Sequence, residues 1–365
     1  MKIADLLNLS VERGASDLHL TAGLPPLVRI DGEICPLFDE PVVGLAGSGE
    51  RIDQQKVLAL LHEVMHDAQR REFEDRLEAD FSYELRGVAR FRVNAFHQNR
   101  GAAAVFRTIP AKVMTMEALG LGPIFNTIAD APRGLVIVTG PTGSGKTTTL
   151  AALIDYLNET KRQHILTIED PIEFVHEHNN CVITQREVGI DTQSFDDALK
   201  SSLRQAPDVI LIGEIRSMET MEYAMSFADT GHLCVATLHA NNANQAIERI
   251  MHLAPKDMHD KLRFDLSLNI RAIVAQQLVP TPDGKGRVAA IEVLLNTPLV
   301  SDLIQRNEIG SLKEAMKKGK EQGMQSFDMA LYDLYKQGRI EMDQALHHAD
   351  SPNDLRLMIK LDASD

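Results

Sequence analysis

The chain has 365 residues, of which 44% are apolar and 25% charged, so it is long enough for about two globular domains and too apolar to be mainly disordered. Its net charge of -14 makes nucleic acid and anionic lipid unfavourable partners for the surface as a whole. Cys35, Cys181 and Cys234 form no C-x-x-C pair, which argues against a zinc site or a disulfide framework. There is neither a leader pattern nor an apolar run long enough to span a bilayer, so we expect a cytoplasmic protein that reaches a membrane only through partners.

The first part of the chain mixes short helices and strands. Apolar spacing predicts helices near residues 1–8, 54–65 and 67–77, and strands at 16–20, 27–30, 89–96 and 103–107. Residues 41–49, rich in Val and Gly, are expected to form a loop. We therefore predict an α+β domain over residues 1–108, followed by a linker at 109–118.

The rest of the chain alternates strands and helices. Continuous apolar runs at 135–139, 164–168, 209–212 and 233–238 are typical of buried parallel strands. The fold class predicted for residues 119–365 is therefore α/β, with a helical end from about residue 299.

The segment Gly140-Pro-Thr-Gly-Ser-Gly-Lys-Thr147 matches the phosphate-binding pattern G-x-x-x-x-G-K-[ST], between an apolar run and a helical segment. Glycines let backbone N–H groups surround phosphates, Lys146 can reach the terminal phosphates, and Thr147 can hold Mg²⁺. ATP and Mg²⁺ are the predicted cofactors. The predicted nucleotide-binding residues are Gly140, Pro141, Thr142, Gly143, Ser144, Gly145, Lys146, Thr147 and Thr148.

Polar side chains follow the other three strands as well. Because ligands bind beyond the carboxyl ends of parallel strands, these residues should converge on the nucleotide. Orienting a water and holding a metal both suit carboxylates, for which the candidates are Glu169, Asp170, Glu173 and Glu214. Glu214 is predicted to assist Mg²⁺, because the preceding Gly213 stands where an Asp is usual; Asp170 and Glu169 are the other metal candidates.

Two histidines flank the last of these strands, at residues 232 and 239. His239, which follows it, is predicted to sense the γ-phosphate. His232 lies seven residues earlier, and residues seven apart on a strand face opposite sides, so we favour an ordinary structural role for it.

Arg90, Arg92 and Arg107 lie on predicted strands of the first domain. One interpretation is that they supply charge to the phosphates of a neighbouring subunit. The alternative is a solvated strand face.

Together these segments resemble a known family. The phosphate loop, residues 165–176, Gly213-Glu214 and residues 230–239 resemble the Walker A motif, Asp box, Walker B motif and His box of secretion ATPases. Over nearly its full length the chain resembles type IV pilus retraction motors of the PilT/PilU family. Residues 14–20, 87–96 and 140–147 are similar to PilT, whereas 185–191, 203–208, 238–245 and 350–356 are similar to PilU.

This resemblance implies a PAS-like first domain, a RecA-like second domain and a homohexameric ring with ATP sites between subunits. It also implies Glu173 as the catalytic base, Glu214 as a metal and nucleotide contact, and Arg90, Arg92 and Arg107 as intersubunit arginines. The implied function is an ATPase that drives pilus retraction and twitching motility at the inner membrane, acting on a PilC-like platform protein.

Two rival interpretations remain. One is an accessory ring with weak turnover that reinforces a second retraction ATPase, as the PilU-like segments allow. The other is a RecA-like nucleic-acid motor, which the net charge and the aromatic content of only 5% disfavour.

Overall fold

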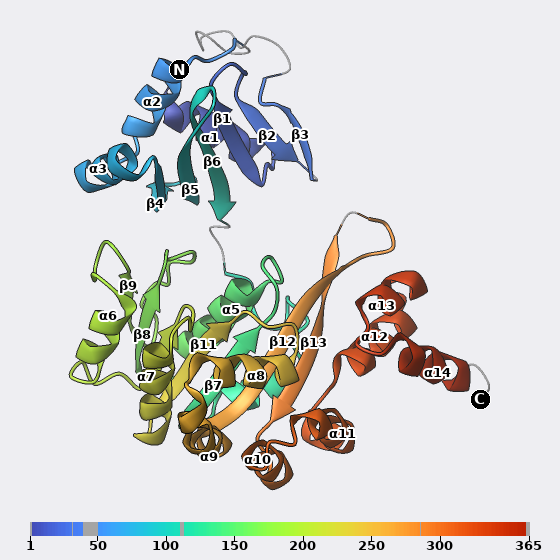
Figure 1. The fold of residues 1–365 in the computed structure, drawn as a ribbon. Helices are drawn as coiled ribbons and strands as arrows, with labels where there is room; N and C mark the ends of the chain where they lie inside the picture. The colour runs from blue at the N-terminus through green and yellow to red at the C-terminus, as the bar shows by residue number, and fades with distance from the viewer. Residues whose placement is uncertain (1, 31, 39–49, 110–112, 285, 363–365) are drawn as a thin grey trace. The chain divides into compact units, whose positions relative to one another are not determined.

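The computed structural model describes residues 2–30, 32–38, 50–109, 113–284 and 286–362 (Figure 1). The chain forms two compact units, a first unit of Met1–Lys112 with Pro171–Val175 and a second unit of Val113–Asp170 with His176–Asp365. Each unit has its own sheet, which confirms the predicted α/β class. The loop predicted at 41–49 and residues 110–112 of the predicted linker lie outside the described residues.

The first unit is built on a six-stranded antiparallel sheet of order β3-β2-β1-β6-β5-β4. Strand β5 alternates as predicted, because Phe91, Val93 and Ala95 are buried while Arg90 and Arg92 are partly exposed. Strand β4 was not predicted. The elements are α1 (Ile3–Glu12), β1 (Asp17–Thr21), β2 (Leu27–Ile30), β3 (Glu33–Pro36), α2 (Gln54–His62), α3 (Asp67–Arg76), β4 (Glu78–Leu85), β5 (Ala89–Gln98) and β6 (Gly101–Ile109).

The second unit contains a seven-stranded sheet of order β13-β12-β7-β11-β10-β8-β9, parallel except for β13 at one edge. The four predicted strands are present as β7, β8, β10 and β11, whereas β9, β12 and β13 were missed. The strands are β7 (Gly134–Thr139), β8 (His164–Glu169), β9 (Val182–Glu187), β10 (Val209–Ile212), β11 (Leu233–Leu238), β12 (Ile270–Pro280) and β13 (Arg287–Leu295).

Helices cover both faces of this sheet (Figure 1). Helices α6 to α11 pack on one face of the sheet, and α4 and α5 pack on the other. Successive strand residues point to opposite faces, so Leu135 belongs to the first of these two hydrophobic cores and Val136 to the second. Helices α12 to α14 pack on β12 and β13, confirming the helical end. The helices are α4 (Ile124–Ala129), α5 (Lys146–Thr160), α6 (Phe195–Ser202), α7 (Met218–Asp229), α8 (Ala243–Leu253), α9 (His259–Asn269), α10 (Pro298–Gln305), α11 (Leu312–Lys318), α12 (Phe327–Lys336), α13 (Met342–His348) and α14 (Pro352–Asp362), with short 3₁₀ turns at Lys256–Met258, Ile309–Ser311 and Lys320–Gln322.

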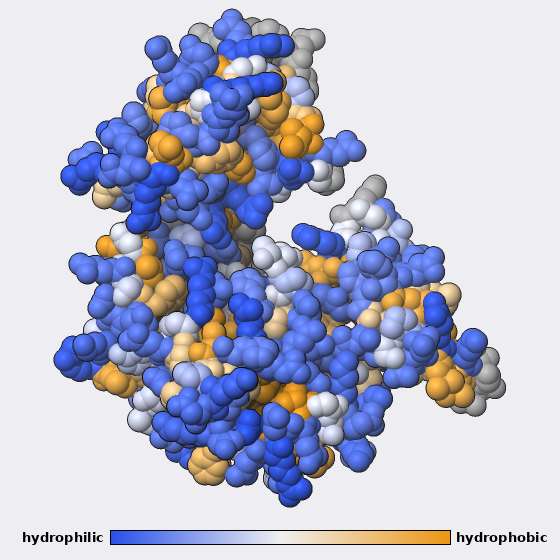
Figure 2. Space-filling model, viewed as in Figure 1, coloured by the Kyte–Doolittle hydropathy of each residue, from blue (hydrophilic) through white to orange (hydrophobic). Residues whose placement is uncertain are grey.

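The surface seen in Figure 2 is mainly hydrophilic with small apolar patches. Large apolar side chains are exposed on α9, at Phe264 and Leu268, and on α14, at Leu357 and Leu361. Across the described parts of the chain, no helix is both long and apolar enough to cross a membrane.

Asp17 joins three strands of the first unit. It pairs with Arg107 on β6 at 2.9 Å and with Arg29 on β2 at 3.6 Å, and only 5% of its side chain is exposed. Burial raises the pKa of Asp17, but hydrogen bonds from Arg107 and Ser16 and the charge of Arg107 outweigh it, so its pKa lies below the ordinary 3.8. The stability that this shift contributes is present above pH 3.8 and is lost as the pH falls through the folded-state pKa.

We predict that Asp17→Asn lowers the free energy of unfolding by about 1 to 3 kcal/mol at neutral pH, because two arginines lose a charged partner. The difference from wild type should shrink as the pH falls below 3.8, as measured by urea unfolding. Glu72→Gln breaks the exposed Arg76–Glu72 pair and should change stability by less than about 0.5 kcal/mol. A constant Asp17→Asn deficit at every pH would contradict the assignment.

Candidate functional site

The phosphate loop connects the end of β7 to the start of α5. Strand β7 is fully buried, and α5 begins at Lys146 directly after Gly145. Gly140, Gly143 and Gly145 have φ angles of 152°, 77° and 89°, a region that side chains disfavour. A Cβ at Gly140 would lie 2.3 Å from the carbonyl oxygen of Gln276, so glycine is required there by space as well.

The loop has the features of an anion site. Ser144 is only 3% exposed, and its hydroxyl has no hydrogen-bond partner among the described residues. The Lys146 ammonium lies over the loop, 2.9 Å from the carbonyl oxygen of Gly140 and 3.0 Å from that of Pro141. A helix N-terminus, an ammonium and a buried hydroxyl together fit the phosphates of a nucleotide.

Gln276 on β12 supports this loop. It was not among the predicted site residues, because β12 itself was not predicted. Its side-chain oxygen accepts a hydrogen bond from the Thr149 hydroxyl at 2.7 Å. Its amide nitrogen would lie 2.8 Å from a Cβ at Gly145. Gln276 therefore holds the first turn of α5 and limits residue 145 to glycine.

Glu214 and His239 meet at the carboxyl edge of the sheet, as predicted. Glu214 lies 3.2 Å from Nε2 of His239 and 2.7 Å from Arg216, and 19% of its side chain is exposed. Burial lowers the pKa of His239, the charges of Lys146, Arg249 and Arg216 lower it further, and Glu214 opposes them. The lowered pKa favours the neutral imidazole, which can donate one hydrogen bond and accept another.

Gly213 precedes Glu214 where nucleotide-binding strands usually end in Asp. Its N–H donates to the carbonyl oxygen of Ile168 at 2.8 Å, so β8 passes very close. A Cβ at residue 213 would lie 3.1 Å from that oxygen and 3.2 Å from the Cα of Glu169. The approach of β8 explains why a side chain is disfavoured at this strand end.

The two other metal candidates differ in their surroundings. Glu169 accepts hydrogen bonds from the Thr167 hydroxyl at 2.7 Å and from the Gln185 amide at 3.3 Å, so its carboxylate is held within the sheet. Asp170, the next residue, is exposed. Glu169 is therefore oriented by the strands, whereas Asp170 is available to solvent.

Glu173 belongs to a different unit from the phosphate loop. Pro171–Val175 packs with the first unit, where Glu173 lies 3.9 Å from Arg92. Arg92 also pairs with Asp80 at 2.7 Å. The structure thus brings together a predicted base and a predicted arginine within the first unit, whereas Lys146 belongs to the second unit.

The other two arginines have partners on neighbouring strands. Arg90 donates to the Ser82 hydroxyl at 2.8 Å, and Arg107 pairs with Asp17 at 2.9 Å. The side chain of Arg107 is 67% exposed in spite of this contact. These contacts agree with the strand positions predicted for both residues and leave their intersubunit role a prediction.

His232 lies just before β11, at the opposite end of that strand from His239. Its Nδ1 is 3.1 Å from the carbonyl oxygen of Phe227, and its ring packs edge-on against Phe227 at 6.0 Å. These contacts agree with the structural role favoured for His232.

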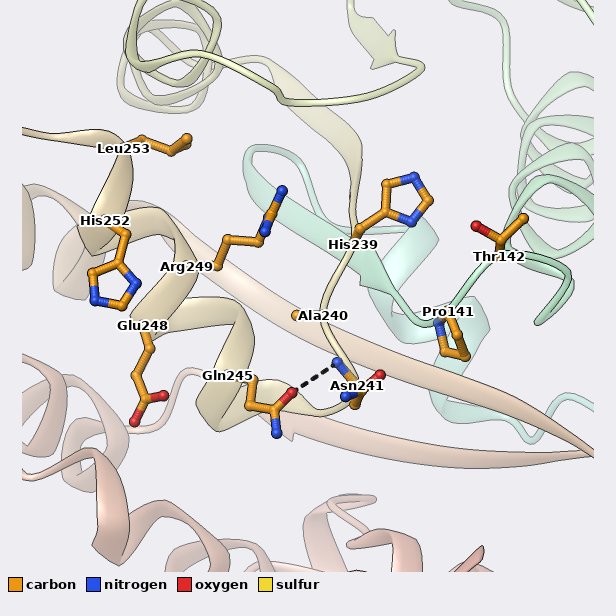
Figure 3. A pocket seen from close by; sticks show the side chains of 10 residues that line it. All are labelled: Pro141, Thr142, His239, Ala240, Asn241, Gln245, Glu248, Arg249, His252 and Leu253. Atoms are coloured by element: carbon orange, nitrogen blue, oxygen red, sulfur yellow. Dashed lines mark hydrogen bonds between the residues drawn. The ribbon is translucent and has the colours of Figure 1, made fainter.

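A pocket of about 790 Å³ lies beside the phosphate loop. Figure 3 shows His239 between Pro141 and Thr142 of the loop and side chains of α8. Arg249 of α8 lines this pocket and was missed in the sequence, although its charge acts on His239. The other lining residues are Ala240, Asn241, Gln245, Glu248, His252 and Leu253.

The sequence pattern of the family described as "Type II/IV secretion system protein" matches residues 49–346. The chain belongs to this family. It is 55% identical over 361 residues to the type IV pilus ATPase PilU of Pseudomonas aeruginosa, covering 99% of this chain and 92% of that protein. It is 49% identical over 352 residues to PilT, named as a retraction ATPase of the same organism, covering 96% and 99%.

A solved structure shows the same fold. The crystal structure of the pilus retraction motor PilT with bound ADP superimposes with a TM-score of 0.88 at 42% identity, covering 98% of this chain and 99% of that one. The strands, phosphate loop and helical end described above therefore have counterparts in a nucleotide-bound relative.

We predict opposite effects for the two histidines. His239→Ala should lower ATP turnover by more than about tenfold with little change in stability, because His239 lies at the phosphate edge of the sheet. His232→Ala should keep turnover and lower the free energy of unfolding by about 1 to 2 kcal/mol, because it removes a hydrogen bond and a ring contact. Steady-state turnover and chemical unfolding test both. A loss of turnover in His232→Ala at unchanged stability would reverse the assignment.

Proposed function

We propose that this protein is an ATP-hydrolysing motor that drives retraction of a type IV pilus. One observation supports it most strongly: a glycine-rich phosphate loop, supported by Gln276, lies at the same sheet edge as the Glu214–His239 pair. Similarity to PilT and PilU over nearly the whole chain supports the coupling of that chemistry to a pilus. The residues at the strand ends thus support ATP hydrolysis, and the similarity to PilT and PilU supports pilus retraction as the process that hydrolysis drives.

Each site residue has a proposed role. Backbone groups of residues 140–148 and the Lys146 ammonium bind the nucleotide phosphates, and Thr147 and Glu214 hold Mg²⁺ with Glu169 or Asp170 nearby. Mg²⁺ would neutralise phosphate charge during transfer to water. Glu173 orients the attacking water, and His239 hydrogen-bonds the terminal phosphate. Arg90, Arg92 and Arg107 serve the site of a neighbouring subunit.

The proposed assembly is a homohexameric ring at the cytoplasmic face of the inner membrane. Its domains are residues 1–108, a linker at 109–118 and an ATPase domain at 119–365. A PilC-like platform protein of the pilus machine would receive the motion. No nucleic acid is needed, and the net charge of -14 disfavours one.

A second candidate function is an accessory ring that reinforces another retraction ATPase. It is favoured by the higher identity to PilU, 55% against 49% to PilT. Lys146, Glu173 and Glu214 are all present in this chain, so the two candidates differ in turnover and not in the residues of the site.

Two substitutions test the proposed catalytic site. Lys146→Ala should abolish tight nucleotide binding, because the ammonium that reaches the phosphates is lost. Glu173→Gln should keep binding but lower turnover by about 100-fold or more, because the amide cannot accept a proton. Binding is measured with a fluorescent ATP analogue, and turnover by phosphate release with Mg²⁺.

Glu177→Gln is the matched control, since Glu177 is an exposed carboxylate four residues further along the chain. It should leave both binding and turnover unchanged. Normal turnover by Glu173→Gln would move the base assignment to Glu214.

Steady-state turnover of the purified protein separates the two candidate functions. We expect turnover above about 0.1 per second without any second ATPase. This threshold is about tenfold below the lower end of typical enzyme turnover numbers. Negligible turnover at saturating Mg·ATP, restored by adding a second retraction ATPase, would favour the accessory ring instead.

A further inference from the structure

Two segments distant in the sequence meet beside the site. Residues 238–245 contain the loop after β11, and residues 350–356 contain the turn into α14 and the first residues of that helix. Both segments resemble PilU in sequence. The Asn242 amide donates to the Asp350 carboxylate at 3.3 Å. This contact joins the segment that carries His239 to the C-terminal helices.

Asn242 is well placed to transmit force. It is 7% exposed, and its side-chain oxygen caps α8 by accepting from the Gln245 N–H at 3.0 Å. Only Ala240 and Asn241 separate it from His239, and Ala240 is fixed to the end of β7 by the Thr139 hydroxyl, which lies 2.9 Å from its N–H and 2.8 Å from its carbonyl oxygen. We call residues 239–242 the His239 loop. Because only two residues separate Asn242 from His239, a displacement of Asn242 is expected to displace His239 as well.

Glu292 makes a second connection between the same elements. It lies on β13 with no exposed surface. One carboxylate oxygen accepts from the Ala243 N–H, the first of α8, at 2.8 Å, and the other accepts from the Phe327 N–H, the first of α12, at 3.4 Å. A single buried carboxylate therefore caps a helix next to the site and a helix of the C-terminal group.

Asp350 is also held from the C-terminal side. It pairs with Lys313 of α11 at 2.8 Å, and its N–H donates to Asp328 of α12 at 2.9 Å. Its side chain is 22% exposed, so the contact with Asn242 is shielded from water but not deeply buried. The turn between α13 and α14 is thereby tied to α11, α12 and the His239 loop together.

The charges around Glu292 show that these groups act on one another. Burial raises the pKa of Glu292 to about 7; the Ala243 N–H lowers it, the Asp350 charge raises it, and the Phe327 N–H and Lys313 lower it. Asp328 of α12 also faces Asp350 and Lys313, and its pKa is raised by burial. Loss of Asp350 would remove one of the influences that favour the neutral form of Glu292.

We infer that Asn242, Glu292 and Asp350 are positioning residues that transmit the position of helices α12 to α14 to the His239 loop and so set the rate of ATP hydrolysis. This inference rests on the proposed ATPase function, which it extends by naming an input to the site. A partner that displaces the C-terminal helices would then change hydrolysis without touching the nucleotide.

The test uses the full-length chain and three variants. Asn242→Ser keeps a helix-capping hydroxyl but removes the amide donor, and Asp350→Ala removes the acceptor. Each single variant should lower kcat by about fivefold or more while the affinity for ADP changes less than about twofold. The double variant should be no slower than the slower single one, since both remove the same contact.

Two controls separate positioning from simple destabilisation. Asp350→Asn keeps an oxygen that can accept from Asn242, and it should retain most of the wild-type kcat. Asp362→Ala breaks the Lys336–Asp362 pair of 2.9 Å, which joins the same helices α12 and α14 at the surface. It should leave kcat unchanged. The proposal is overturned if kcat of Asp350→Ala equals that of wild type, or if Asp362→Ala lowers kcat as much as Asp350→Ala does.

Hydrogen exchange provides a readout that does not need turnover. Amides of the His239 loop and the first turn of α8 should exchange faster in Asp350→Ala than in wild type or Asp362→Ala. If wild type itself has no turnover, the autonomous form of the proposed function fails, and this comparison alone decides the inference. Equal exchange in Asp350→Ala and Asp362→Ala would then refute the connection.

Discussion

The hydroxyl of Thr139 fixes the phosphate loop relative to the His239 loop. It lies 2.9 and 2.8 Å from the carbonyl oxygens of Leu238 and Ala240, and it accepts from the Ala240 N–H at 2.9 Å. One side chain at the end of β7 therefore satisfies polar backbone groups where the neighbouring strand β11 stops. Because Gly140 and His239 directly follow these two strands, the sheet and this contact hold the two residues close to each other.

Strand β12 extends this arrangement to the rest of the unit. It pairs with β7 only as far as Ala275, which is opposite Thr139, so the residues beyond Ala275 project past the end of β7. Gln276 faces the phosphate loop, and Gln277 exchanges hydrogen bonds of 3.0 Å with His348 at the end of α13. Consecutive residues on a strand point to opposite faces, so one short stretch of β12 supports the phosphate loop on one side and the C-terminal helices on the other.

The sequence predicted those strands whose composition is uniform. Strands β7, β8, β10 and β11 are buried on both faces, so they are continuous apolar runs. Strand β12 was missed because Gln276 and Gln277 interrupt its apolar run, and these are the residues that contact the loop and helix α13. Strand β9 lies at the sheet edge and is only partly buried, so its residues carry no such pattern. Strands β9 and β12 thus contain polar side chains that hydrogen-bond to neighbouring elements, and these side chains interrupt the apolar pattern.

For the site, residue types at strand ends were predictable and their partners were not. A strand–helix alternation is enough to bring Lys146, Glu214 and His239 to one edge, because parallel strands share their direction. The reason for Gly213 is visible only once β8 is seen to pass within 3.1 Å of a Cβ built there. Glu292 did carry a signal, since a carboxylate inside the apolar run Val288-Ala-Ala-Ile-Glu-Val-Leu-Leu295 must have polar partners when buried. Sequence could not say that these partners are the first N–H groups of two helices 84 residues apart in the chain, at Ala243 and Phe327, because only tertiary packing brings them together.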